Sequence, residues 1–131
     1  MLEPLHPKLW RRRLHAIVTA LTIVRDIDDS ACLRRLYHLL ALTPEPLRQW
    51  FAPSLSEDMF EQVLLQSCRT AALSLIGKAF DLALTVDRHG EGVAVTLRLG
   101  EADVEVAAQG SSLARAVVRG ICEIGLKVSD S

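Results

Sequence analysis

The spacing of apolar residues changes twice along this chain of 131 residues. Up to about residue 76, apolar positions recur at steps of three and four, which is typical of amphipathic helices. Between residues 82 and 108 they alternate with polar or small residues, which is typical of strands with one buried face. From residue 111 to residue 128 the helical spacing returns. The pattern therefore predicts several helices, then strands, then a final helix.

Three helices are predicted in the first 53 residues. Apolar residues between 10 and 24 form a broad stripe, which indicates a helix buried over much of its circumference. Asp28, Asp29 and Ser30 are N-cap residues for a second helix that continues to residue 40. Thr43 followed by proline is typical of a helix start, and it predicts a short third helix over 44–51.

The segment Ser54-Leu55-Ser56-Glu57 has the spacing of a capping box and precedes an apolar run over 59–76. This run predicts the longest helix of the chain. Because Gly77 lies where such a helix would end, the helix is not expected to reach the strands.

Three short strands are predicted over 82–87, 93–99 and 103–108, joined by polar, glycine-containing turns. Gly110 and Ser111 then cap the last helix, whose positions 115, 119, 123 and 127 are expected to face water. A sheet of three strands with one dry face needs cover on that face. We therefore expect both the helix before the sheet and the helix after it to cover this side.

These elements define an α+β fold within one domain, residues 1–131. Helical hairpins in residues 1–53 pack on an α-β-β-β-α unit in residues 54–131, which holds a three-stranded antiparallel sheet. The apolar share of 50% is high for a chain of this size. Surplus apolar surface predicts a protein partner or a homo-oligomer.

Charge and cysteine content narrow the classes of function. The formal net charge is −1, and the three cysteines are scattered without a metal-binding or redox spacing. Scattered cysteines favour buried thiols in a reducing compartment, so we expect a cytoplasmic protein. The apolar stretch over 14–24 is interrupted by polar residues and is too short to span a bilayer, so no membrane association is expected.

No pattern in the sequence indicates catalysis. There is no nucleophile beside a base, no glycine-rich loop leading into a helix, and no set of histidines and cysteines at metal spacing. The sequence therefore predicts no enzyme, no metal and no cofactor.

Two groups of polar residues are the predicted contact surfaces for a partner. Arg11, Arg12 and Arg13 stand at the start of a helix, where positive charge opposes the helix dipole, and this favours a partner-facing role. The polar face of the predicted sheet is the second surface, and it carries Thr85, Thr96, Arg98 and Glu105. The favoured function is a non-catalytic protein-binding module, and a self-associating structural subunit is an alternative.

A helix-turn-helix over residues 36–51 is the other alternative, and it would make the protein a DNA-binding regulator. Arg48 and Gln49 would reach base edges, and Arg34 and Arg35 would contact phosphates. Pro46, which stiffens the second helix, argues against this interpretation. A plain helical hairpin explains the same pattern.

Residues 80–127 resemble a known family, the phage ABA sandwich domain, in their strand-turn-strand-turn-strand-helix order. The hairpin over 81–97, the strand over 104–106 and the small, apolar helix over 112–120 carry the resemblance. The chain lacks the tryptophans that such domains often have near the first hairpin. The resemblance implies an origin on a phage or other mobile element, and with it a regulator or inhibitor of a host complex.

The same element order also resembles a double-stranded RNA-binding domain. Such a domain has a lysine cluster at the start of its second helix, which contacts phosphates across a groove. Only Arg115 and Arg119 are basic in the corresponding stretch here, so RNA binding is not expected.

Overall fold

The structure is a computed structural model that describes residues 3–23, 28–77, 79–86 and 92–129, with the backbone alone at 84–86. Five helices precede the sheet: α1 Pro7–Ile23, α2 Asp29–Ala41, α3 Arg48–Phe51, α4 Glu57–Gln66 and α5 Cys68–Ser74. The sheet and the final helix follow: β1 Phe80–Val86, β2 Val93–Leu99, the 3-10 turn η1 Gly100–Ala102, β3 Val104–Gly110 and α6 Leu113–Val128.

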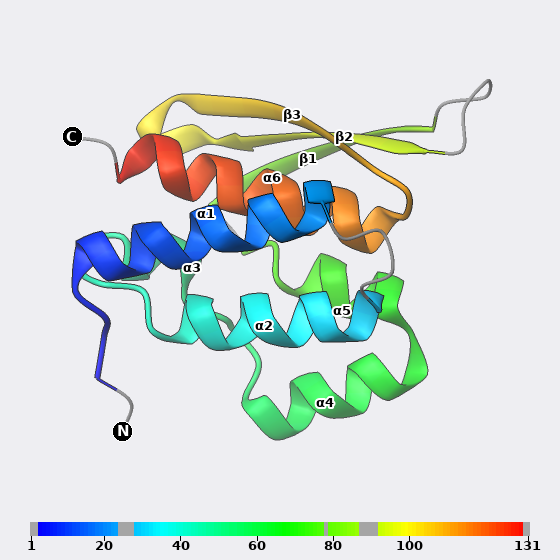
Figure 1. The fold of residues 1–131 in the computed structure, drawn as a ribbon, viewed down its shortest axis with the longest axis horizontal. Coiled ribbons are helices and arrows are strands. Elements are labelled where there is room, and N and C mark those ends of the chain that lie inside the picture. Colours follow the sequence, from blue (N-terminus) through cyan, green and yellow to red (C-terminus); the bar gives the residue numbers. More distant parts are fainter. Residues whose placement is uncertain (1–2, 24–27, 78, 87–91, 130–131) are drawn as a thin grey trace.

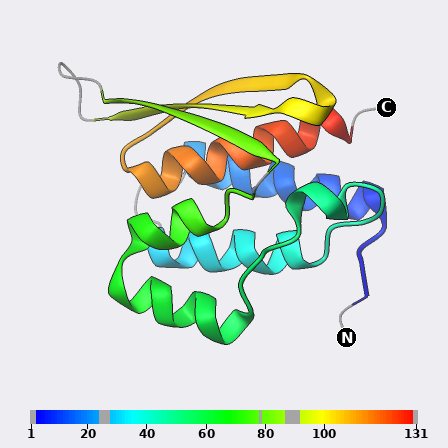
Figure 2. The same ribbon diagram turned by 180° about the vertical axis from the view of Figure 1, so that it is seen from behind.

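The predicted α+β class and the three-stranded antiparallel sheet are confirmed. The strands lie in the order β1-β2-β3, and Leu97 on β2 pairs with Leu82 on β1 and with Val106 on β3. Val95, Leu97 and Leu99 are buried, whereas Arg98 between them is exposed, so the alternation gives the sheet one dry face. Figures 1 and 2 show the helices on this side of the sheet alone.

Helix α6 lies directly on the dry face of the sheet and forms the centre of the fold (Figure 1). It packs against β2 and β3 on one side and against α1, α2 and α5 on the others. Its buried residues are Ala114, Ala116, Val117, Val118, Gly120, Ile121, Cys122, Ile124 and Gly125. The sequence predicted that positions 115, 119, 123 and 127 face water, but the first three are half-buried, because a helix with neighbours on most sides buries most of its circumference.

Two glycines allow the neighbours of α6 to approach it closely. A Cβ atom at Gly120 would lie 2.6 Å from Leu97 Cδ1, on the sheet side. A Cβ atom at Gly125 would lie 2.7 Å from Leu14 Cδ1 and 3.2 Å from Trp10 Cη2, on the α1 side. Five residues correspond to about 140° of rotation around a helix, so the two glycines serve different contacts.

The prediction of one long helix over 59–76 is wrong. Ser67 has φ −164° and ψ 120°, which ends α4, and its hydroxyl accepts a hydrogen bond from the Thr70 amide to begin α5. Ser56, rather than Ser54, caps α4, because its hydroxyl accepts from the Met59 amide. The longest described helix is instead α1, with 17 residues.

The prediction that two helices cover the sheet also needs correction. The principal contacts of α5 are with α6, α4 and α2, and α4 lies farther from the sheet than α5 does (Figure 1). In the described part of the chain, α6 supplies the main helical contacts with the strands. Its N-cap is Ser112, whose hydroxyl accepts from the Arg115 amide, one residue after the predicted Gly110-Ser111.

The predicted helix over 44–51 is reduced to the single turn of α3. Thr43 is fully buried, and its hydroxyl donates to the Leu40 carbonyl at 2.6 Å. The hydroxyl therefore closes the end of α2 instead of capping a new helix. Trp50 on α3 donates through Nε1 to Glu101 in η1 at 2.6 Å, which ties this turn to the sheet.

Replacing Gly125 tests the close contact between α1 and α6. We expect Gly125→Val to lower the free energy of unfolding by about 2 kcal/mol, because overpacking against Trp10 exceeds the small gain in helix propensity. Gly100→Val is the matched control, since a Cβ there meets nothing within 4 Å, and it should change stability by less than about 0.5 kcal/mol. Urea unfolding measures both values, and equal stability of the two variants would contradict the packing described.

A candidate partner-binding groove between two helices

Helices α1 and α2 run antiparallel across one face of the molecule (Figure 1). Trp10, in the first turn of α1, connects them near the C-terminal end of α2, because its indole Nε1 donates to the Leu39 carbonyl at 3.2 Å. Two adjoining hollows of about 230 and 120 Å³ lie between the helices. We call them together the α1–α2 groove, lined by Arg13, Ile17, Ala20, Leu21, Ala31, Cys32, Arg35, His38, Leu39 and Leu42.

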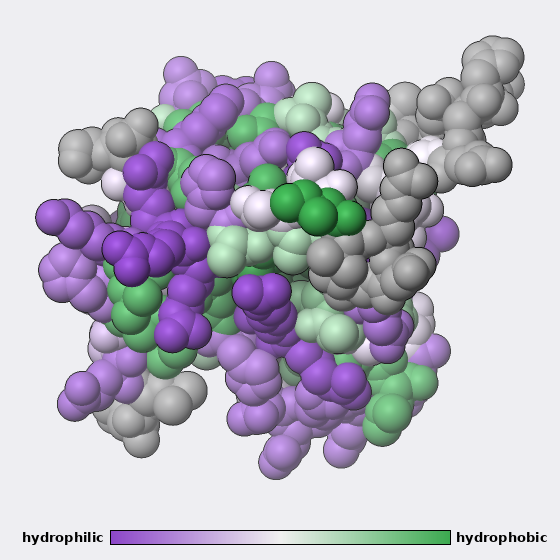
Figure 3. All heavy atoms as spheres, in the orientation of Figure 1, coloured by the Kyte–Doolittle hydropathy of each residue, from purple (hydrophilic) through white to green (hydrophobic). Residues whose placement is uncertain are grey.

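The floor of the groove is apolar and belongs to the core. Ile17 and Leu39 are only 3% and 5% exposed, so they are held in place by the packing beneath them. Ala20 and Ala31 have short side chains, and the helices therefore leave space between them at this end. Figure 3 shows apolar surface among hydrophilic side chains near the middle of this face.

The rim of the groove is basic. Arg13 from α1 and Arg35 and His38 from α2 line its larger hollow. Helix α1 contains no acidic residue anywhere in its sequence, so nothing on that helix offsets these charges. The groove therefore combines an apolar floor with a positive edge.

The structure separates the three consecutive arginines predicted to face a partner. Successive helical residues point about 100° apart, and only Arg13 reaches the groove. Arg11 and Arg12 line a shallow hollow of about 270 Å³ with Lys8 and His15, elsewhere on α1. Arg12 is exposed and Arg11 is half-buried.

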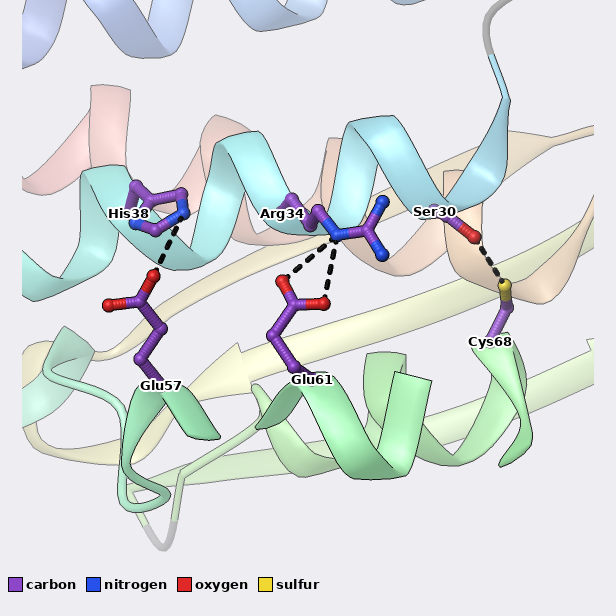
Figure 4. A network of polar contacts seen from close by, with 6 residues as sticks. All are labelled: Ser30, Arg34, His38, Glu57, Glu61 and Cys68. Atoms are coloured by element: carbon purple, nitrogen blue, oxygen red, sulfur yellow. Dashed lines mark hydrogen bonds and ion pairs between the residues drawn. The ribbon is translucent and has the colours of Figure 1, made fainter. Parts of the chain in front are cut away.

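The opposite side of α2 is occupied by contacts with α4 and α5 (Figure 4). The Nε of Arg34 donates to Glu61 at 2.9 Å, and the Ser30 hydroxyl lies 3.4 Å from the Cys68 sulfur. His38 Nε2 lies 3.9 Å from a carboxylate oxygen of Glu57, so His38 stands between this network and the groove. Arg34 and Arg35 therefore belong to different surfaces.

This arrangement differs from the helix-turn-helix considered for residues 36–51. Arg48 is half-buried and Gln49 is exposed, but α3, which carries them, has only four residues. A recognition helix must extend through the major groove, and a single turn does not. Arg34 is paired with Glu61 and Arg35 lines the groove, and the DNA-binding alternative stays a prediction.

The other predicted contact surface, the polar sheet face, lies apart from the groove. Thr96 stands between Ala83 and Ala107 in the strand register, and Arg98 lies opposite Glu105. The Arg98 guanidinium also lies 3.3 Å from Asp103. The side chain of Thr85 is outside the described residues. The self-associating subunit that this open face would suit stays a prediction.

Two of the three cysteines are sequestered. Cys32 and Cys122 are buried, and burial raises the pKa of each thiol above its ordinary value. The neighbouring carboxylate of Glu123 adds to the rise in the pKa of Cys122, whereas Arg115 opposes the rise at Cys32. Cys32 therefore contributes apolar surface to the groove rather than a nucleophile.

Within the described residues, no three side chains of His, Cys, Asp or Glu come together as a set of metal ligands. None of the described helices is long and apolar enough to cross a membrane. Comparisons of the chain with protein-family models, with curated proteins and with solved structures found no match. The resemblance of residues 80–127 to a phage ABA sandwich domain therefore stays a prediction.

The three thiols should react at different rates. Cys68 is half-buried, so we expect iodoacetamide to alkylate it first at pH 8, at least about tenfold faster than the two buried cysteines. The buried thiols stay protonated and have to be exposed by local opening of the fold. Mass spectrometry of tryptic peptides measures this order, with the urea-unfolded chain as the control. Equal labelling of Cys122 and Cys68 in the folded protein would contradict the burial of α6.

Proposed function

We propose that this protein is a non-catalytic protein-binding module whose partner docks in the α1–α2 groove. One observation carries the proposal: an apolar hollow of about 230 Å³ opens between two helices and is bordered by the side chains of Arg13, Arg35 and His38. Apolar floors with polar rims are the usual anatomy of protein interfaces.

The groove has properties that favour binding over a purely structural role. Its floor residues are packed into the core, so a partner would meet a preformed surface and lose little free energy in ordering it. Its rim includes Arg13 and Arg35, and arginine is enriched at the energetic centres of interfaces. A cytoplasmic regulator or inhibitor of a host complex, as the resemblance to phage domains implies, is the form of this function that we favour.

A selection from a random peptide library tests the proposal. Peptides of about 16 residues would be displayed and selected for binding to the immobilised protein. We expect groove-binding sequences to be enriched, and their affinities to fall by at least about tenfold on Ala20→Trp. Ala20 is half-buried on α1 and lines the smaller hollow, so an indole at this position fills the space that a ligand needs.

Thr19→Trp is the matched control, because Thr19 is exposed on the same helix and lines neither hollow of the groove. It should leave peptide affinity within about twofold, as expected for a surface substitution away from the interface. Circular dichroism confirms that both variants fold. If no peptide is enriched, or if both tryptophans weaken binding equally, the groove is not a docking site.

A further inference from the structure

We infer that the α1–α2 groove accepts an acidic amphipathic helix of a protein partner. This inference rests on the proposed function and names the chemistry of the occupant. It is carried by three observations: the groove offers apolar side chains from two helices, its rim is positively charged, and its length fits a short helix.

The backbone of the groove argues for a helical occupant. The walls and floor come from α1 and α2, whose backbone N–H and C=O groups form hydrogen bonds within each helix. An extended peptide gains main-chain hydrogen bonds where it adds to an open strand edge, and helix walls do not provide one. A helix satisfies its backbone internally and presents side chains at steps of three and four, so it can lay an apolar stripe on Ile17, Leu39 and Leu42.

The length of the groove sets the size of the ligand. Along α2 and its C-cap Leu42, the lining residues start at Ala31, which corresponds to about 17 Å at 1.5 Å per residue. This is the length of roughly three helical turns. The occupant therefore needs three or four apolar residues in one stripe.

The charges of the rim argue for an acidic occupant. Arg13 and Arg35 stand on opposite walls of the larger hollow, and a helix lying between them would present its flanking residues to both. Carboxylates at these flanks would form charge-assisted hydrogen bonds with the guanidinium groups, while lysines would be repelled. His38 Nε2 already lies 3.9 Å from a carboxylate oxygen of Glu57, so the attraction for an acidic ligand comes from the two arginines.

A nucleic acid fits the groove less well. Its phosphates would be attracted to Arg13 and Arg35, but a polyanion gains nothing from the buried apolar floor formed by Ile17 and Leu39. The formal net charge of the chain is −1, which adds no general attraction for phosphate.

The adjacent residues Arg12 and Arg13 provide the test. The peptides selected on the groove should carry net negative charge beside an apolar stripe of helical period. Arg13→Glu should weaken the tightest of them roughly fivefold, and Arg35→Glu should do the same. Arg12→Glu makes the same change in net charge on the same helix but outside the groove, and it should alter affinity by less than about twofold at 0.15 M salt. Fluorescence anisotropy measures the dissociation constants.

The outcomes separate this inference from the proposed function. Groove-binding peptides that are neutral or basic would overturn the acidic occupant while the protein-binding function stands. Equal effects of Arg12→Glu and Arg13→Glu would do the same, since the attraction would then be nonspecific. Displacement of the selected peptide by a 20-base-pair DNA duplex, lost in Arg13→Glu, would assign the groove to nucleic acid. Absence of any groove-binding peptide would remove both proposals together.

Discussion

The close approach of α6 to neighbours on two sides is the contact on which the rest of this structure depends. Because Gly120 has no side chain, α6 packs closely on Leu97 of the sheet. Because Gly125 has none either, Trp10 and Leu14 of α1 reach the backbone of α6. Helix α6 therefore covers the apolar face of the sheet and also supports α1. The position of α1 in turn fixes one wall of the groove.

Trp10 connects the packing around α6 to the groove at the surface. Its ring contacts α6 near Gly125, its Nε1 donates to the Leu39 carbonyl of α2, and it packs edge-on to Phe51 with ring centroids 5.5 Å apart. Because one rigid side chain of α1 contacts three other helices, the spacing between α1 and α2 is set by the core. A groove defined in this way is preformed, and a ligand does not have to create it.

Much of the fold could be predicted from the sequence, because it is encoded in local periodicity. The alternation of Val95, Leu97 and Leu99 with polar neighbours specified the sheet, and Asp28 specified the start of α2. The break at Ser67 was missed because the apolar spacing continues through it without a glycine or proline. The extent to which α6 is buried was missed because the sequence suggests that Arg115 faces water. In the structure, the side chain of Arg115 is only 17% exposed and is paired with Asp29.

The groove itself could not be predicted, because it depends on which residues two helices bring together. Arg13 was singled out as partner-facing, but only helix rotation separates it from Arg12, and the sequence does not show where α2 lies. Arg35 and His38, which follow Arg34 on α2, carried no signal that distinguished their face from the side that contacts α4. The broad apolar stripe on α1 was the available hint. A stripe that is wider than one neighbouring helix can cover leaves some apolar residues at the surface.

Native-state hydrogen exchange tests most directly whether α6 is the centre on which the groove is built. Backbone amides of residues 117–124 should exchange only through global unfolding, so that their protection equals the unfolding free energy measured by urea. Amides of α4, at the far side of the helical layers, should exchange through smaller local openings. Amides of α6 that exchange as fast as those of α4 would contradict the account.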